Sequence, residues 1–224
     1  MKIVPAILAE SVQDFLLRLR QAESFTDYVQ IDIMDGVFVP SRSFPAAEIT
    51  GIDTSLYFEI HLMVKHPSAL MSCIDNPHLK KVIFHIESDV KYLDLVSQLK
   101  KRGIEAGLAV NPETEIDEFG AIAESVGTLL FLTVAPGRYG SLFKPEVLKK
   151  IREARDIFKN KTIAADGGIS IENLKLFLDT GVDYVCVGSR IFLHNNPAES
   201  YRRFTNRLVE LEAGSTSLQK EGYQ

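Results

Sequence analysis

Residues 29–40, VQIDIMDGVFVP, decide the fold of this chain. The stretch begins with β-branched residues at every second position, a pattern typical of a buried strand. Asp32 lies inside this apolar run, where an unpaired carboxylate is costly, so the fold must supply a partner or a cation for it. The Asp35-Gly36 pair that follows indicates a turn, and we interpret Asp35 as a residue that shapes the loop.

Composition favours a globular protein and argues against several classes of partner. Of 224 residues, 46% are hydrophobic and 25% charged, and the net charge of −5 with scattered basic residues indicates neither nucleic acid nor an anionic membrane surface as a partner. Met1 and Lys2 lead directly into a strand-like run, and no apolar run reaches roughly 18 residues, so we expect neither a signal peptide nor a membrane span. Cys73 and Cys186 match no metal or redox spacing, and we expect Cys186 to be a small buried hydrophobe in a reducing, cytoplasmic setting.

One pattern repeats along the chain: a short β-branched run, a polar break, and an amphipathic helix. The expected strands are residues 2–8, the run around Asp32, 56–62, 81–85, 104–110, 128–134, 162–165 and 184–187. The first expected helix begins after Ser11 and has Phe15, Leu16 and Leu19 on one face. The other expected helices are residues 44–49, 67–74, 92–101, 116–124, 145–158, 171–180 and 197–212.

Eight strand-then-helix units predict a parallel sheet with crossover helices, and eight is the number that closes into a (β/α)8 TIM barrel. The 224 residues spread over eight units are 28 residues each, which leaves no room for a large inserted domain. We therefore expect a single α/β barrel over residues 1–212 and a polar, frayed tail over residues 213–224. A doubly wound open sheet is the alternative, but no GxGxxG or GxxxxGK[ST] follows the first strand.

Polar side chains fall at the carboxyl ends of the expected strands, where such barrels place catalytic groups. They are Asp32, His61, His85, Asn111 and Asp166. Asp32, His61 and Asp166 can point into one mouth. This arrangement allows a divalent metal site, or a proton acceptor and donor on opposite faces of a substrate. Each could instead be satisfied separately by backbone N–H groups or a lysine, but three at corresponding strand ends favour a shared site. His85 fits a place in the mouth and a hydrogen bond to a neighbour equally well.

Glycines late in the chain indicate an anion site. Barrels often bind phosphate at the loops after strands seven and eight, and glycine lets backbone N–H groups approach an anion closely. The loop after strand six could close over the same group, with Arg138 as a candidate phosphate contact. The alternative is that these glycines serve only tight turns. The candidate phosphate-binding residues are Gly137, Arg138, Gly140, Ser141, Gly167, Gly168, Gly188 and Ser189.

The ordered set of motifs resembles the ribulose-phosphate 3-epimerase family over residues 3 to about 204. The motifs that carry the resemblance are Pro5-Ala6-Ile7-Leu8, Asp32-Ile33-Met34-Asp35-Gly36, Phe38-Val39-Pro40, His61-Leu62-Met63, His85-x-Glu87, Asn111-Pro112, Pro136-Gly137, Asp166-Gly167-Gly168-Ile169 and Gly188-Ser189. The resemblance implies a TIM barrel of the ribulose-phosphate-binding type and a metal-dependent isomerase of the pentose phosphate pathway. Such an enzyme inverts C3 of a ketose phosphate, D-ribulose 5-phosphate to D-xylulose 5-phosphate. We expect a small phosphorylated ketose as its partner and a homo-oligomeric state.

The resemblance also implies roles for individual residues. Asp32 and Asp166 match the two acid/base residues that exchange a proton through an enediolate, and His61 matches a metal ligand. The implied cofactor is one divalent ion, Zn, Fe, Mn or Co, held by these three residues, and it would stabilise the developing oxygen charge. Met34 and Met63 would form an apolar floor under the reacting carbon, although packing in the core is their simpler role.

The chain departs from the family pattern at the same mouth. Gln30 stands where the family has a metal-binding histidine and is a candidate fourth ligand. Its amide oxygen can ligate a hard cation, but it suits a transition metal less well than imidazole does. Ala6, Val37 and Ala135 replace a usual serine, histidine and asparagine, and residues 138–141 also differ. These changes leave two alternatives open: an epimerase for a hexulose 6-phosphate, or a barrel that binds a sugar phosphate without turning it over.

Overall fold

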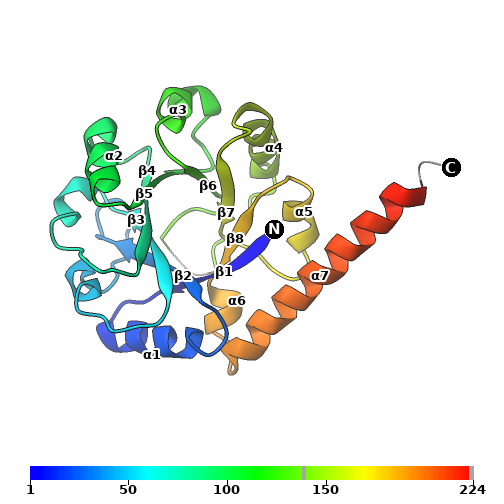
Figure 1. Ribbon diagram of the computed structural model, residues 1–224, viewed down its shortest axis with the longest axis horizontal. Helices are drawn as coiled ribbons and strands as arrows, with labels where there is room; N and C mark the ends of the chain where they lie inside the picture. The colour runs from blue at the N-terminus through cyan, green and yellow to red at the C-terminus, as the bar shows by residue number, and fades with distance from the viewer. Residues whose placement is uncertain (138–139, 222–224) are drawn as a thin grey trace.

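The computed structural model describes residues 1–137 and 140–221, and its eight parallel strands close into a barrel in sequential order (Figure 1). The closing pair is β8 with β1, which confirms the predicted (β/α)8 TIM barrel. The strands are β1 (Lys2–Leu8), β2 (Tyr28–Met34), β3 (Tyr57–Met63), β4 (Leu79–His85), β5 (Glu105–Val110), β6 (Thr128–Leu132), β7 (Thr162–Asp166) and β8 (Tyr184–Val187).

Helices surround the barrel, with two short 3-10 helices in the first half of the chain (Figure 1). They are α1 (Val12–Ala22), η1 (Ala46–Ile49), η2 (Pro67–Leu70), α2 (Tyr92–Lys101), α3 (Ile116–Ala123), α4 (Val147–Ile157), α5 (Leu174–Leu178), α6 (Ser189–Phe192) and α7 (Pro197–Glu221). Helices α1 to α5 lie between successive strands of the sequence, whereas α6 and α7 follow β8. All eight strands run parallel, so their carboxyl ends meet at one mouth.

Several predicted helices differ in extent from the observed ones. The prediction for 67–74 is wrong beyond Leu70, because the carbonyls of Met71 and Ile74 accept hydrogen bonds from the distant Arg102 guanidinium instead of continuing the helix. Helix α6 was not predicted at all. Helix α7 continues to Glu221 instead of ending near residue 212, since residues 213–221 contain no proline and several strong helix formers.

Helix α1 shows how the sequence positions an outer helix. The Ser11 side chain caps its first turn by accepting a hydrogen bond from the Asp14 N–H at 3.1 Å. Phe15 and Leu19 are buried, and the Phe15 ring stacks on Phe44 with centroids 4.2 Å apart. Leu16 was predicted on this face, but its side chain is 39% exposed, because the apolar stripe facing the sheet is narrower than the sequence indicated.

Most of the apolar interior forms two layers. The larger one lies between the sheet and the helices and contains the outward-facing strand residues, such as Ile31 and Ile60. The smaller one fills the inside of the barrel with inward-facing side chains. It consists of Val4, Ala6, Ile83, Ala109, Leu130, Leu132, Ala164, Tyr184 and Cys186, with Tyr28 packed against it.

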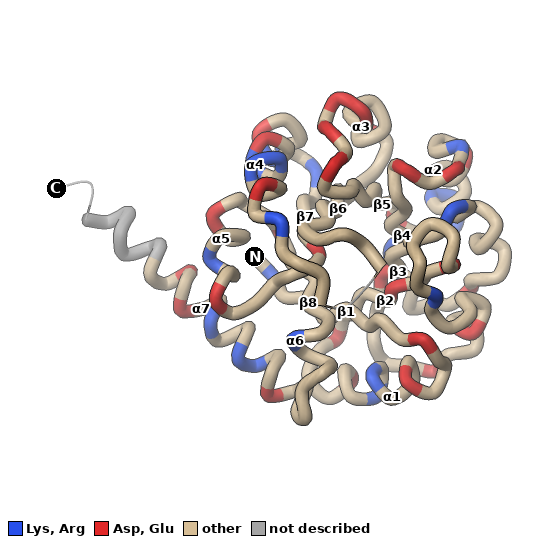
Figure 2. Tube along the Cα trace, turned by 180° about the vertical axis from the view of Figure 1, so that it is seen from behind, with Lys and Arg blue, Asp and Glu red and all other residues tan. Residues whose placement is uncertain are grey.

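Charged residues of both signs are intermixed along the outer helices, and the strands of the barrel carry few of them (Figure 2). Among the helices of the described ranges, none is both long and apolar enough to cross a membrane.

A buried ion pair lies inside the barrel near the starts of the strands. Glu59 is 0% exposed, and its carboxylate lies 3.1 Å from the Lys81 ammonium. The hydroxyls of Tyr28 and Tyr184 also donate to this carboxylate at 3.0–3.1 Å. A buried charge of this kind is tolerated only with its partners in place, so the four side chains form one unit.

Replacing Lys81 by methionine keeps the apolar stem but leaves Glu59 without its cation. We expect Lys81→Met to lower the free energy of unfolding by about 3–5 kcal/mol, measured by urea denaturation. The neighbouring Lys80 is exposed and lies over the Tyr57 ring, so Lys80→Met is the matched control and should cost less than about 1 kcal/mol. Equal losses in the two variants would contradict a special role for the buried pair.

Candidate functional site

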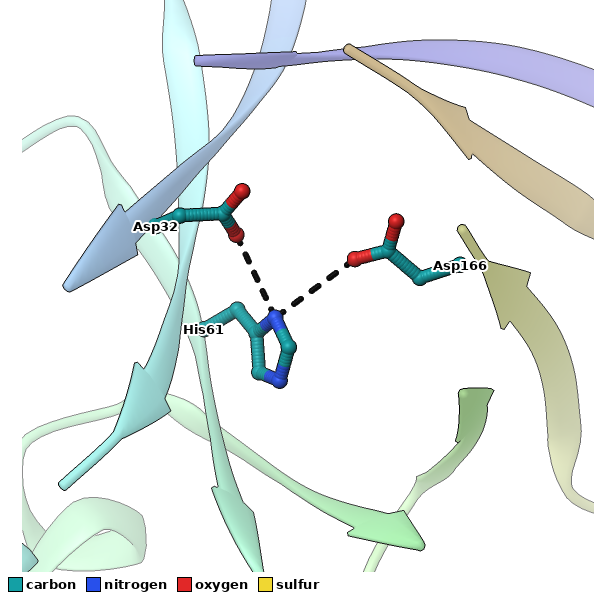
Figure 3. Close-up of side chains that lie close together, drawn as sticks. All are labelled: Asp32, His61 and Asp166. Atoms are coloured by element: carbon teal, nitrogen blue, oxygen red, sulfur yellow. Dashed lines mark hydrogen bonds and ion pairs between the residues drawn. The ribbon is translucent and has the colours of Figure 1, made fainter. Parts of the chain in front are cut away.

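The strand register brings the predicted acidic and imidazole groups together at the mouth of the barrel. Asp32 on β2 is paired in register with His61 on β3, and Asp166 is the last residue of β7. Figure 3 shows the three side chains pointing toward one another from their separate strands. One ligand atom from each lies within 4.8 Å of the others.

These groups have one another as partners. His61 Nδ1 lies 3.2 Å from Asp32 Oδ1 and 3.5 Å from Asp166 Oδ2. Gln30 adds a second link, because its Nε2 donates to Asp32 Oδ1 at 3.0 Å and to Asp166 Oδ2 at 2.7 Å. The alternative of three separately satisfied residues therefore does not describe this mouth.

The environment shifts the proton affinity of Asp32 and His61 in the same direction for different reasons. Burial, helped by the nearby Asp166 charge, raises the pKa of the Asp32 carboxyl to about 6. Burial alone would lower the pKa of His61, but the hydrogen bonds with Asp166 and Asp32 outweigh it and raise this pKa to about 9. Without a cation, His61 therefore holds both of its ring protons at neutral pH.

A chain of hydrogen bonds continues from His61 away from the mouth. His61 Nε2 lies 2.9 Å from His85 Nε2, and His85 Nδ1 lies 3.1 Å from Glu87 Oε2. Burial, together with the neighbouring His61, lowers the pKa of His85 to about 4, so His85 is neutral. The only consistent arrangement has His61 Nε2–H donating to His85 and His85 Nδ1–H donating to Glu87. This chain fixes the His61 ring with Nδ1 facing the carboxylates.

The donor set fits a divalent cation. Asp32, His61 and Asp166 offer two carboxylate oxygens and one imidazole nitrogen, a combination that divalent transition metals accept. The His61 nitrogen that faces the carboxylates is the one left free for a ligand bond once it loses its proton, since the other donates to His85.

A cavity of about 70 Å³ opens beside these groups and is lined by Asp32, His61 and Asp166. Leu132, Val134 and Ile169, all buried, also line it. The predicted phosphate residues on its wall are Gly137, Gly140, Ser141, Gly167, Gly168, Gly188 and Ser189. The cavity therefore joins the acidic and imidazole groups to the glycine-rich loops.

Glycine is required at two of these positions by close packing. Gly167 has φ +105°, and a Cβ there would lie 2.3 Å from a Val134 methyl group. Gly137 has φ +90°, and its Cβ would lie 2.6 Å from Val39. These glycines let the backbone come close to the cavity, as an anion site needs.

The other predicted residues take different places. Met63 lines the cavity, whereas Met34 is buried beside it in the same small apolar cluster. Asn111 does not line the cavity, and its buried side-chain oxygen has no hydrogen-bond partner among the described residues. Arg138 lies outside the described residues.

Asp35 shapes the loop after β2, as expected. Its carboxylate accepts hydrogen bonds from the N–H groups of Val37 and Phe38 at 2.8 Å and of Lys65 at 2.7 Å. Burial would raise the pKa of this carboxyl, but the three N–H donors outweigh it and lower the pKa.

Two contributors to the site were not identified from the sequence. Cys186 is buried as predicted, but its thiol also lines the cavity and donates to Gln30 Oε1 at 3.1 Å. Burial raises the pKa of this thiol, so it keeps its proton. Glu87 is the second, because its contact with His85 supports His61 indirectly. The alternation of inward and outward side chains along β8 could have indicated Cys186. The His85-x-Glu87 spacing could have indicated Glu87.

Comparisons with known proteins agree with this geometry. The profile of the ribulose-phosphate 3 epimerase family matches residues 2–192. A ribulose-phosphate 3-epimerase of Chlamydia pneumoniae is 33% identical over 78% of this chain and 79% of that protein. The cytoplasmic isoform of the same enzyme from Oryza sativa subsp. japonica is 30% identical over 88% of this chain and 90% of that protein.

Among solved structures, 3-hexulose-6-phosphate synthase from Salmonella typhimurium matches with a TM-score of 0.65 and 17% identity. The match covers 94% of this chain and 100% of that one, and at this identity it shows the barrel fold alone. The family profile, which matches most of the chain, and the curated relatives identify the family as well as the fold. The chain belongs to the ribulose-phosphate 3-epimerase family and is an isomerase that acts on carbohydrates.

Proposed function

We propose that this chain inverts C3 of D-ribulose 5-phosphate to give D-xylulose 5-phosphate, with a divalent cation as its cofactor. The observation that carries the proposal is the placement of the Asp32 and Asp166 carboxylates in one cavity with the glycine-rich loops. Relatives named ribulose-phosphate 3-epimerase support a ribulose phosphate as the substrate and C3 as the reacting carbon. The cytoplasmic isoform among them supports a cytoplasmic setting.

The two carboxylates carry the proton in this proposal. Asp32 belongs to β2 and Asp166 to β7, so they approach a substrate in the cavity from different strands. One takes the proton from C3 to form an enediolate, and the other delivers a proton to the opposite face of the same carbon. The loss and return of the proton on different faces inverts the configuration.

Three side chains would hold the cation: Asp32, His61 and Asp166. A cation bound there would offset the negative charge that develops on substrate oxygen when the proton leaves. His85 and Glu87 keep the His61 ring in the orientation that presents Nδ1 to the cavity.

The remaining wall orients the substrate. Backbone N–H groups around Gly167, Gly168 and Gly188 would bind the phosphate, which fixes the distance from the phosphate to the reacting carbon. Met63 supplies an apolar surface beside the acidic groups.

Proton exchange with solvent tests the acid/base pair. In D2O, the wild-type protein should introduce deuterium at C3 of ribulose 5-phosphate, followed by proton NMR. Asp166→Asn should form no deuterated xylulose 5-phosphate and should lower kcat for epimerisation by at least about 100-fold, since an amide cannot carry the proton on its face of C3. Asp179→Asn, at the exposed residue that follows α5, is the control and should exchange deuterium and epimerise normally. Normal formation of xylulose 5-phosphate by Asp166→Asn would remove Asp166 from the mechanism.

Metal content tests the proposed cofactor separately. Elemental analysis of the purified protein should find about one equivalent of a divalent metal. Asp32→Ala removes one of the three donors and should lose most of that metal, whereas Asp179→Asn should retain it. Equal metal content in Asp32→Ala and the wild type would place the cation elsewhere.

The preferred substrate can be determined by comparing kcat/KM for ketose phosphates of different chain length. We expect kcat/KM for ribulose 5-phosphate to exceed that for a six-carbon ketose 6-phosphate by roughly tenfold or more, because one added carbon changes transition-state binding by at least this factor in a site shaped for the shorter chain. The measurement is a coupled spectroscopic assay with both substrates on the same preparation. A preference for the six-carbon substrate would reassign the enzyme to a hexulose phosphate.

A further inference from the structure

Gln30 is completely buried inside the barrel, and its side chain lies between those of Asp32 and Asp166. It is 0% exposed, and its amide nitrogen bridges Asp32 Oδ1 at 3.0 Å and Asp166 Oδ2 at 2.7 Å. An amide NH2 group has two hydrogens to donate, and both are used here. The bridge offsets part of the repulsion between the two carboxylates.

The other end of the amide also has a defined partner. Cys186 on β8 is paired in register with Asp166, and its Sγ lies 3.1 Å from Gln30 Oε1. The thiol donates and the amide oxygen accepts, so every polar atom of the Gln30 side chain is satisfied. The orientation of the amide is therefore set by its neighbours on both sides.

Rotating the Gln30 amide by 180° would exchange the positions of its oxygen and its NH2 group. The oxygen would then face Asp32 and Asp166, which is repulsive unless a cation lies among the three oxygens. The NH2 group would face the Cys186 sulfur, which is a weak acceptor. The presence of a cation thus decides which orientation of Gln30 is the favourable one.

We propose that Gln30 is a cation-selecting ligand that turns its amide oxygen toward the metal when one binds and bridges the two carboxylates when none does. This inference rests on the metal part of the proposed function. With Gln30, the donors are three oxygens and the single nitrogen of His61. Carbonyl and carboxylate oxygens favour hard cations such as Mn²⁺, whereas a second imidazole would favour Zn²⁺.

The test measures dissociation constants for Mn²⁺ and Zn²⁺ on the metal-stripped full-length protein, by competition with a chelator. Gln30→His should shift the ratio of the two affinities toward Zn²⁺ by roughly tenfold or more. Gln98→His makes the same change on the exposed face of α2 and should leave both constants unchanged. An unchanged ratio in Gln30→His would overturn the inference.

A second variant separates a ligand from a mere bridge. Gln30→Leu should bind Mn²⁺ roughly tenfold more weakly if the amide oxygen is a ligand. Tighter binding by Gln30→Leu would show that the amide only competes with the cation for the carboxylates, and would overturn the inference. Should this variant not fold, as judged by circular dichroism, Gln30→Ala, which also lacks the amide oxygen, is measured in its place.

These measurements also distinguish the inference from the proposed function. If the wild type binds neither Mn²⁺ nor Zn²⁺, the inference and the cofactor proposal both fail, while deuterium exchange at C3 still reports on epimerisation. If the wild type binds metal and exchanges deuterium but Gln30→His leaves the affinity ratio unchanged, only the inference fails.

Discussion

Two carboxylates held close together in a largely buried pocket repel each other, and the mouth of this barrel is organised around that repulsion. Asp32 and Asp166 come from separate strands, and both His61 and Gln30 lie between them with donor groups. In a medium of low dielectric constant, such donors are worth far more than they would be in water. The closed barrel makes the arrangement durable, because each carboxylate is attached to a hydrogen-bonded strand and not to a loop.

The donors that hold the carboxylates are themselves held by residues further from the cavity. His61 depends on His85 and Glu87, and Glu87 in turn accepts hydrogen bonds from the Asn111 N–H and the Thr114 hydroxyl. This network ties the third, fourth and fifth strands to the loop before α3. A similar dependence exists near the starts of the strands, where Glu59 relies on Lys81 and two tyrosines. The inside of the barrel therefore contains two polar networks, each of which needs all of its members.

The repeating strand-then-helix pattern was sufficient to predict the barrel, because its signal depends only on local alternation and turn chemistry. The same pattern placed Asp32, His61 and Asp166 at one mouth, since the carboxyl ends of parallel strands must meet there. What local patterns could not supply were contacts between distant segments. The early end of η2 depends on Arg102, which lies about thirty residues further along the chain. The sequence predicts Cys186 only as a small buried hydrophobe, because the contact of its thiol with Gln30 exists only after β8 closes against β1.

The cavity wall combines the acidic and imidazole groups with apolar side chains that take no part in their hydrogen bonds. Leu132 and Val134 belong to β6 and the loop that follows it, and their apolar side chains line the wall without taking part in the network of Asp32, His61 and Gln30. The dimensions of the pocket and its reactivity are consequently encoded by separate sets of residues. Divergence within such a lineage can then proceed by enlarging or reducing the side chains on the sixth unit, so that new sugars are admitted while the proton-carrying apparatus is inherited intact.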